Sequence, residues 1–128
     1  MRIRLSAIIV SFFLLTLALA ACGESSGGGS GSGNELDMGA ASFTQTSITL
    51  STGQALHMVD SQDFGGAHMI CIGQNGKCDS GASGPSELAD PGMAFNPGTT
   101  KDVTFSTAGT YHLTCTLHPN MNVTVTVQ

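Results

Sequence analysis

Three side chains that can bind a soft metal ion lie close together near the C-terminal end of the sequence. The stretch YHLTCTLHPNM, residues 111–121, carries Cys115, His118 and Met121. A thiolate, an imidazole and a thioether suit copper or zinc rather than the hard cations Mg²⁺ and Ca²⁺. Each residue alone is more often structural, but the joint spacing Cys-x₂-His-x₂-Met in one loop predicts a metal site.

A second imidazole would complete a ligand set of two histidines, one cysteine and a weak axial methionine, the arrangement of mononuclear blue-copper sites. His68 is the candidate, because the alternation in residues 67–72 places it on the same inward face as Ile70 and Ile72. His57 and His112 fall on outward faces, so we expect solvent around them.

Short alternating segments from residue 41 onward indicate the elements that position these ligands. Apolar residues alternate with polar ones, and turn residues recur every eight to twelve positions. Residues 79–99 are rich in Gly, Pro, Ser and Asp and read as irregular, with room for one short helical turn in 85–93. The pattern predicts an all-β protein, an antiparallel β-sandwich. Cys115 is expected at the inward end of a strand, and the other two ligands on the loop that follows.

The first part of the sequence has the layout of an export signal. A basic start precedes an apolar run over residues 5–21 and then Cys22. The ending LAAC resembles a bacterial lipobox, which implies a lipid on Cys22; the alternative is a retained membrane helix. We therefore expect a signal peptide at 1–21, a lipidated cysteine and flexible Gly/Ser linker at 22–37, and a folded domain at 38–128. The expected location is extracytoplasmic, on the outer face of a cell membrane.

The cysteines and the charge add further constraints. Cys71 and Cys78 flank the turn signal Asn75-Gly76, which predicts a disulfide across a hairpin in an oxidising compartment. The alternative is a zinc site that these two thiols form with His68. After removal of the signal peptide, two lysines face nine acidic residues, a formal charge of −7. This charge disfavours nucleic acids and suits a basic protein partner.

Residues 47–127 resemble the cupredoxins, the plastocyanin and azurin superfamily. The matching phrases are PGT at 97–99, VTF at 103–105, AGTY at 108–111 and the ligand loop, whose short spacing is most similar to that of the amicyanins. The resemblance implies a Greek-key antiparallel β-sandwich with one type 1 blue copper ion. It implies the copper ligands His68, Cys115, His118 and Met121. One departure is Met69, since the family commonly has Asn after the strand histidine, where its side chain ties the two ligand loops together.

The resemblance implies a one-electron carrier rather than an enzyme. A copper oxidase or reductase needs further copper sites, and a binuclear centre needs a second cysteine in the loop. The alternative function is an extracytoplasmic copper chaperone or storage protein. As partners we expect redox proteins, such as a cytochrome or an oxidase, and the membrane through the lipid anchor, with the protein itself a monomer. The expected docking patch surrounds His118, with Met93, Ala94 and Phe95 adding to it.

Overall fold

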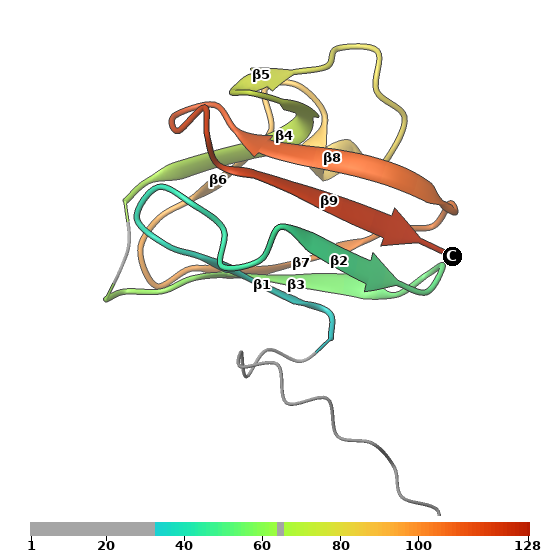
Figure 1. Ribbon diagram of the computed structural model, residues 1–128, viewed down its shortest axis with the longest axis horizontal. Helices are drawn as coiled ribbons and strands as arrows, with labels where there is room; N and C mark the ends of the chain where they lie inside the picture. Colours follow the sequence, from blue (N-terminus) through green and yellow to red (C-terminus); the bar gives the residue numbers. More distant parts are fainter. Residues whose placement is uncertain (1–32, 64–65) are drawn as a thin grey trace, which may run out of the picture.

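The computed structural model describes residues 33–63 and 66–128. The predicted signal peptide and Cys22 lie outside this part of the chain. Within these ranges, nine strands and one turn of 3₁₀ helix form two packed layers (Figure 1). In chain order these are β1 Glu35–Met38, β2 Ser47–Leu50, β3 Ala55–Asp60, β4 His68–Gln74, β5 Lys77–Cys78, η1 Ser86–Leu88, β6 Met93–Phe95, β7 Thr100–Thr104, β8 Gly109–Cys115 and β9 Asn122–Val127.

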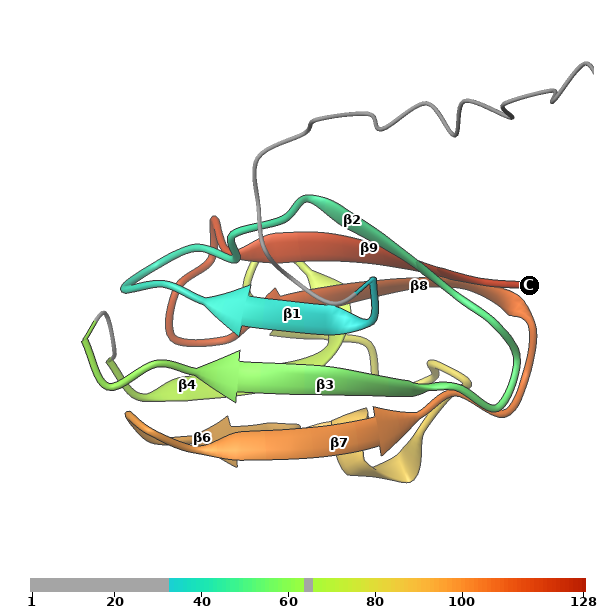
Figure 2. The ribbon, with the colours of Figure 1, turned by 90° about the horizontal axis from the view of Figure 1, so that it is seen from below.

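The strands form two sheets that pack face to face (Figure 2). One sheet has the order β1-β3-β7, and the other has the order β2-β9-β8-β4-β5, with β6 also paired to β4. The predicted all-β sandwich is confirmed, and the short helical turn falls within residues 85–93. The sheets are mixed rather than purely antiparallel, because β1 pairs with β3 and β2 with β9 in parallel.

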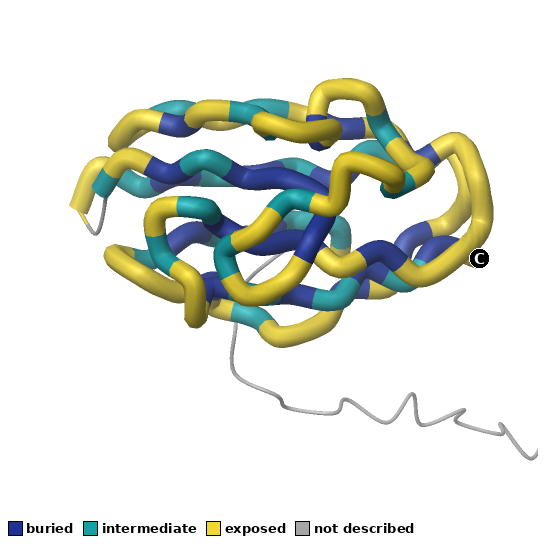
Figure 3. Tube along the Cα trace, turned by 90° about the horizontal axis from the view of Figure 1, so that it is seen from above, coloured by how far each residue is buried: buried dark blue, intermediate teal, exposed yellow. Residues whose placement is uncertain are grey.

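Alternating burial explains why these segments form strands. In β9 the valines are buried and the threonines between them are half-buried, and in β3 Leu56, Met58 and Asp60 point inward. The buried positions follow the inner faces of both sheets, while the exposed positions gather in the connecting loops (Figure 3). The core between the layers includes Leu36, Phe95, Phe105, Leu113 and Val125.

The folded part begins earlier than the expected boundary at Met38. Residues Glu35–Met38, of which the first three were assigned to the linker, form β1 and pair with β3. Leu36 and Met38 are fully buried. The two apolar side chains therefore give this short segment enough burial to join the sheet, although Gly- and Ser-rich sequence precedes it.

The hairpin between β4 and β5 is longer than predicted. β4 continues past Ile72 to Gln74, and the turn consists of Asn75 and Gly76, both with positive φ. This is the conformation of a two-residue hairpin turn, which Asn-Gly favours. The disulfide joins Cys71 to Cys78 across this hairpin with a Cα–Cα distance of 5.6 Å. The predicted disulfide is thus present, and the alternative zinc site is wrong because neither thiol is free.

Candidate metal centre

His68 is the first residue of β4 and lies in the interior at one end of the sandwich. It pairs with Phe95 of β6, and only 1 % of its surface is exposed. Burial lowers the pKa of His68 below its ordinary value, and the neighbouring charge of His118 lowers it further, against upward effects of Asp60 and the Gly39 backbone. Burial therefore favours the neutral ring, the form in which imidazole binds a metal ion.

Cys115 is the last residue of β8 and is fully enclosed. It lies opposite Ile70 of β4 in the sheet, which brings its side chain close to that of His68. Among the described residues it is the one free cysteine. The predicted inward position at a strand end is confirmed.

The loop after Cys115 is a tight turn held by its own backbone. The His118 N–H donates to the Cys115 carbonyl at 3.3 Å, and the Met121 N–H donates to the His118 carbonyl at 2.8 Å. The Cys115 N–H in turn donates to the Met121 carbonyl at 3.0 Å. A further bond, from the Thr116 N–H to the Met69 carbonyl at 2.9 Å, joins this loop to β4. The two ligand segments are thus tied through the backbone at Met69, where the side-chain tie of the resembling family is missing.

Three donor atoms converge at this end of the sandwich. The Cys115 Sγ atom lies 3.8 Å from His68 Nδ1 and 3.6 Å from His118 Nδ1, and all three atoms lie within 4.8 Å of one another. Bonds of about 2.0 Å to imidazole and about 2.3 Å to thiolate, at trigonal angles near 120°, would separate sulfur and nitrogen by about 3.7 Å. The spacing of the donors therefore fits one metal ion without rearrangement of the backbone.

Met121 is the last residue of the loop, directly before β9, and is fully buried. Its position on the ligand loop agrees with the prediction, and its role as the fourth ligand stays a prediction. The other two histidines lie away from the centre. His57 on β3 contacts the carboxylate of Asp102, and His112 on β8 is exposed and hydrogen-bonded to Thr124.

Sequence reasoning missed Asp60, which lies beside the centre. Its side chain is fully enclosed, its Oδ1 atom is 3.9 Å from His68 Nε2, and neither carboxylate oxygen accepts a hydrogen bond from a described residue. Burial raises the pKa of this carboxyl, and the nearby charge of His68 opposes the rise. The signal was in the sequence, since Asp60 continues the inward alternation of Leu56 and Met58.

The surface around His118 is partly apolar. His118 is half-buried, while Leu117 is 56 % exposed and is the most exposed large apolar side chain in the described part. A shallow hollow here is lined by Ala41, Leu117, His118, Pro119 and Asn120. Phe95, which was expected to extend the patch, is buried in the core instead.

Comparison with known proteins agrees with this geometry. The sequence model of a family described as copper binding proteins, plastocyanin/azurin family, matches residues 32–128. No curated protein matches significantly. Among solved structures, amicyanin from Paracoccus versutus is similar, with 18 % identity, a TM-score of 0.55 and coverage of 73 % of this chain and 79 % of that chain. The reduced state of an amicyanin mutant has the same identity and TM-score, with coverage of 73 % and 80 %.

Proposed function

The chain belongs to the plastocyanin/azurin family of copper-binding proteins, and from this premise we propose that it is a one-electron carrier with a single mononuclear copper centre. The observation that carries the proposal is the convergence of His68 Nδ1, Cys115 Sγ and His118 Nδ1. Copper is the cofactor, and when bound it supplies the Cu(I)/Cu(II) redox couple.

The four proposed ligands have different tasks. Cys115 supplies the thiolate, which forms the strongest bond and is the source of visible colour. His68 holds one imidazole on a strand, and His118 supplies the other from the loop. Met121 is the weak axial ligand, which tunes the potential in sites of this type. Because strands and backbone bonds fix both segments, the donors need little movement when the charge of the site changes.

Electrons enter and leave, on this proposal, by way of His118. His118 is half-buried on a loop whose neighbouring residues are exposed, whereas His68 and Cys115 are enclosed. The apolar surface formed by Leu117 and Pro119 surrounds this exit, and a carrier needs a docking surface rather than a substrate pocket. The negative charge of the chain favours encounter with a basic redox partner, such as a cytochrome or an oxidase with a basic docking face.

The enclosed donors support a carrier over a chaperone or storage protein. Copper exchange requires that an incoming ligand reach the donors, yet Cys115 and His68 are 0 % and 1 % exposed. Only the His118 side of the centre faces the surface. This arrangement favours retention of the ion through many cycles of oxidation and reduction.

We also propose that lipid on Cys22 tethers the domain to the outer face of a bacterial membrane. The basic start, the apolar run and the LAAC ending support this, and all lie outside the described residues. No helix in the described ranges has the length and apolar character to cross a membrane. β1 runs parallel to β3, with Met38 beside Asp60 and Glu35 beside His57, so the start of β1 is its end farther from the metal centre. A tether entering there leaves His118 free to meet a partner.

Spectroscopy tests the carrier proposal directly. The purified protein should take up one equivalent of Cu(II), develop an intense blue colour and be reduced reversibly by one electron in voltammetry. Cys115→Ser should bind copper without the blue band while the far-ultraviolet circular dichroism of the β-sandwich is kept. A Cys115→Ser protein that remains blue would show that the thiolate assignment is wrong.

The anchor has a separate test. Cys22→Ala should prevent lipid attachment, so the protein should either remain an uncleaved precursor or be released from the membrane fraction. The mass of the wild-type protein should include the lipid. A mutant with unchanged mass and membrane retention would instead support a retained N-terminal helix.

A further inference from the structure

The disulfide-closed hairpin of β4 and β5 lies against the segment that carries three of the proposed ligands. Cys71, Thr114 and Asn122 are neighbours in one row across three strands, since Cys71 pairs with Thr114 and Thr114 pairs with Asn122. Thr114 immediately precedes Cys115, and Asn122 immediately follows Met121. The row therefore marks both ends of the ligand loop.

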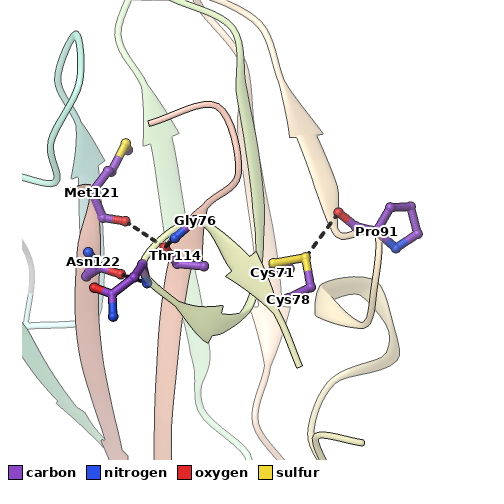
Figure 4. The surroundings of a disulfide bond; sticks show 8 residues. Cys71, Gly76, Cys78, Pro91, Thr114, Met121 and Asn122 are labelled. Atoms are coloured by element: carbon purple, nitrogen blue, oxygen red, sulfur yellow. Dashed lines mark hydrogen bonds between the residues drawn. A yellow bond between two sulfur atoms is a disulfide. The ribbon is translucent and has the colours of Figure 1, made fainter. Parts of the chain in front are cut away.

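The turn of the hairpin lies along this row, and two of its backbone N–H groups form hydrogen bonds to side chains of the row. The Asn75 N–H donates to the Asn122 Oδ1 at 2.9 Å, and the Gly76 N–H donates to the Thr114 Oγ1 at 2.9 Å. At the other end of the hairpin the disulfide fixes Cys78 to Cys71. Figure 4 shows Gly76 facing Thr114 and Asn122, with the disulfide on the opposite side of the hairpin.

The two side chains that accept these hydrogen bonds also donate hydrogen bonds to the ligand loop. The Thr114 hydroxyl donates to the Met121 carbonyl at 3.3 Å, and the Asn122 Nδ2 donates to the Pro119 carbonyl at 3.0 Å. Thr114 is fully buried although it lies on the face of β8 opposite to Cys115. The hairpin thus covers the ligand loop on the Thr114 side, and the metal donors lie on the opposite, Cys115 side.

Direct packing adds to these bonds. A methyl group placed on Gly76 would lie 3.0 Å from both Cα and Cβ of Pro119. The turn can approach this closely only because residue 76 has no side chain, and its φ of +76° also favours glycine. Pro119 follows His118 directly, so the turn packs against the part of the loop that carries the half-buried imidazole of His118.

We propose that this hairpin is a brace for the copper site, in which Thr114 and Asn122 are positioning residues that hold the ligand loop 115–121 in its metal-binding geometry. The inference rests on the proposed function. Neither residue contacts the metal donors, and each acts through backbone carbonyls of the loop. Loss of such outer contacts typically costs about 10- to 100-fold in metal affinity.

The first test removes and restores the Thr114 hydroxyl. Thr114→Val keeps the shape of the side chain but leaves the Gly76 N–H without its acceptor and leaves the Met121 carbonyl with the Cys115 N–H as its one remaining donor. A chelator should remove copper from this variant about 10-fold faster than from the wild type, and the potential and the energy of the visible band should shift. Thr114→Ser, which keeps the hydroxyl, should restore the wild-type values. Wild-type release and spectrum in Thr114→Val would overturn the proposal.

The second test uses two glycines with similar positive φ angles. Gly76→Ala and Gly53→Ala both place a side chain at positive φ, +76° and +83°, but no atom lies within 4 Å of a Cβ at residue 53. Both variants should therefore lose stability, while only Gly76→Ala should push Pro119 and change copper release and the potential. Equal effects of the two variants on release and potential would show that the hairpin contributes stability alone.

A measurement without copper separates this inference from the proposed function. Amide hydrogen exchange in the copper-free protein should be faster at Thr116 and Met121 in Thr114→Val than in the wild type, because the loop bonds open more often. Unchanged exchange would contradict the brace whether or not the protein carries electrons. Conversely, a wild-type protein that binds no copper, yet shows the faster exchange in the variant, would contradict the carrier proposal and leave the brace intact as a device that orders the loop.

Discussion

The Nε2 atom of His68 lies 3.9 Å from Oδ1 of Asp60, and both side chains are shielded from solvent. Asp60 is held from both sides by backbone bonds, its N–H to the Thr99 carbonyl and its carbonyl to the Gly98 N–H. The carboxylate therefore faces the ring nitrogen opposite to the one that points to Cys115. A carboxylate placed behind a metal-binding histidine orients the ring and makes it a stronger donor.

Asp60→Asn should raise the reduction potential of the copper site. A buried negative charge near the centre favours the more positive oxidised state, so its removal favours Cu(I). We expect a shift on the order of 60 mV, which for one electron is a tenfold change in the equilibrium. Voltammetry at neutral pH measures it directly.

Asp102→Asn is the control for this substitution. Asp102 also contacts a histidine, His57, but its side chain is 61 % exposed, on the outer face of the same β1-β3-β7 sheet that carries Asp60. Solvent screens that charge, so the potential should stay at the wild-type value. The same potential in wild type and Asp60→Asn would show that Asp60 carries no charge that the copper site feels.

The copper-free protein should lose stability as the pH falls below about 6.5. Burial lowers the folded-state pKa of His68 below the ordinary value of 6.5. Between these two pKa values the unfolded chain binds more protons than the folded one, so the free energy of unfolding falls with falling pH. Denaturant titrations at several pH values measure the slope.

The comparison that isolates His68 uses two variants. His68→Gln should flatten the slope in this range, whereas His112→Gln, at an exposed position of β8, should leave it unchanged. Asp60 has the opposite effect on stability. Its pKa is raised in the folded state, so above pH 3.8 the folded protein binds more protons than the unfolded chain, and the contribution of Asp60 to the free energy of unfolding grows as the pH falls. A decline that persists in His68→Gln would assign the acid sensitivity to another group.

The sequence alone was sufficient to identify three of the metal-donor residues, but it did not reveal the residues that contact and support them. Residue type, strand alternation and loop spacing identified His68, Cys115 and His118, because these signals are local. Asp60 was missed, although its alternation with Met58 placed it on the inward face. The parallel pairing of β1 with β3 and the contact of Gly76 with Pro119 join residues far apart in sequence, and no local pattern encodes such partners.

Tyr111→Phe should destabilise the domain without changing the copper site. The Tyr111 hydroxyl donates to the Thr107 carbonyl at 2.7 Å, a bond back to the chain a few residues upstream that is typical of β-sandwiches. Its ring packs on Phe105 with centroids 4.9 Å apart, and that contact survives in the variant. We expect a loss of about 1 kcal/mol in the free energy of unfolding. A change in the visible spectrum would contradict the assignment of this residue to stability alone.

Met121→Leu tests whether the thioether is the fourth ligand. Leucine has a similar volume and suits the fully buried position, so the fold should be kept at a cost below about 1.5 kcal/mol. The backbone bonds of residue 121 to Cys115 and His118 do not depend on the side chain. Loss of a weak axial donor should leave the thiolate colour in place and raise the potential, since the axial ligand tunes it. Met58→Leu, a buried methionine of β3 away from the ligand loop, is the control and should leave the potential unchanged. If Met121→Leu and Met58→Leu both keep the wild-type potential and spectrum, Met121 packs the core and does not bind the metal.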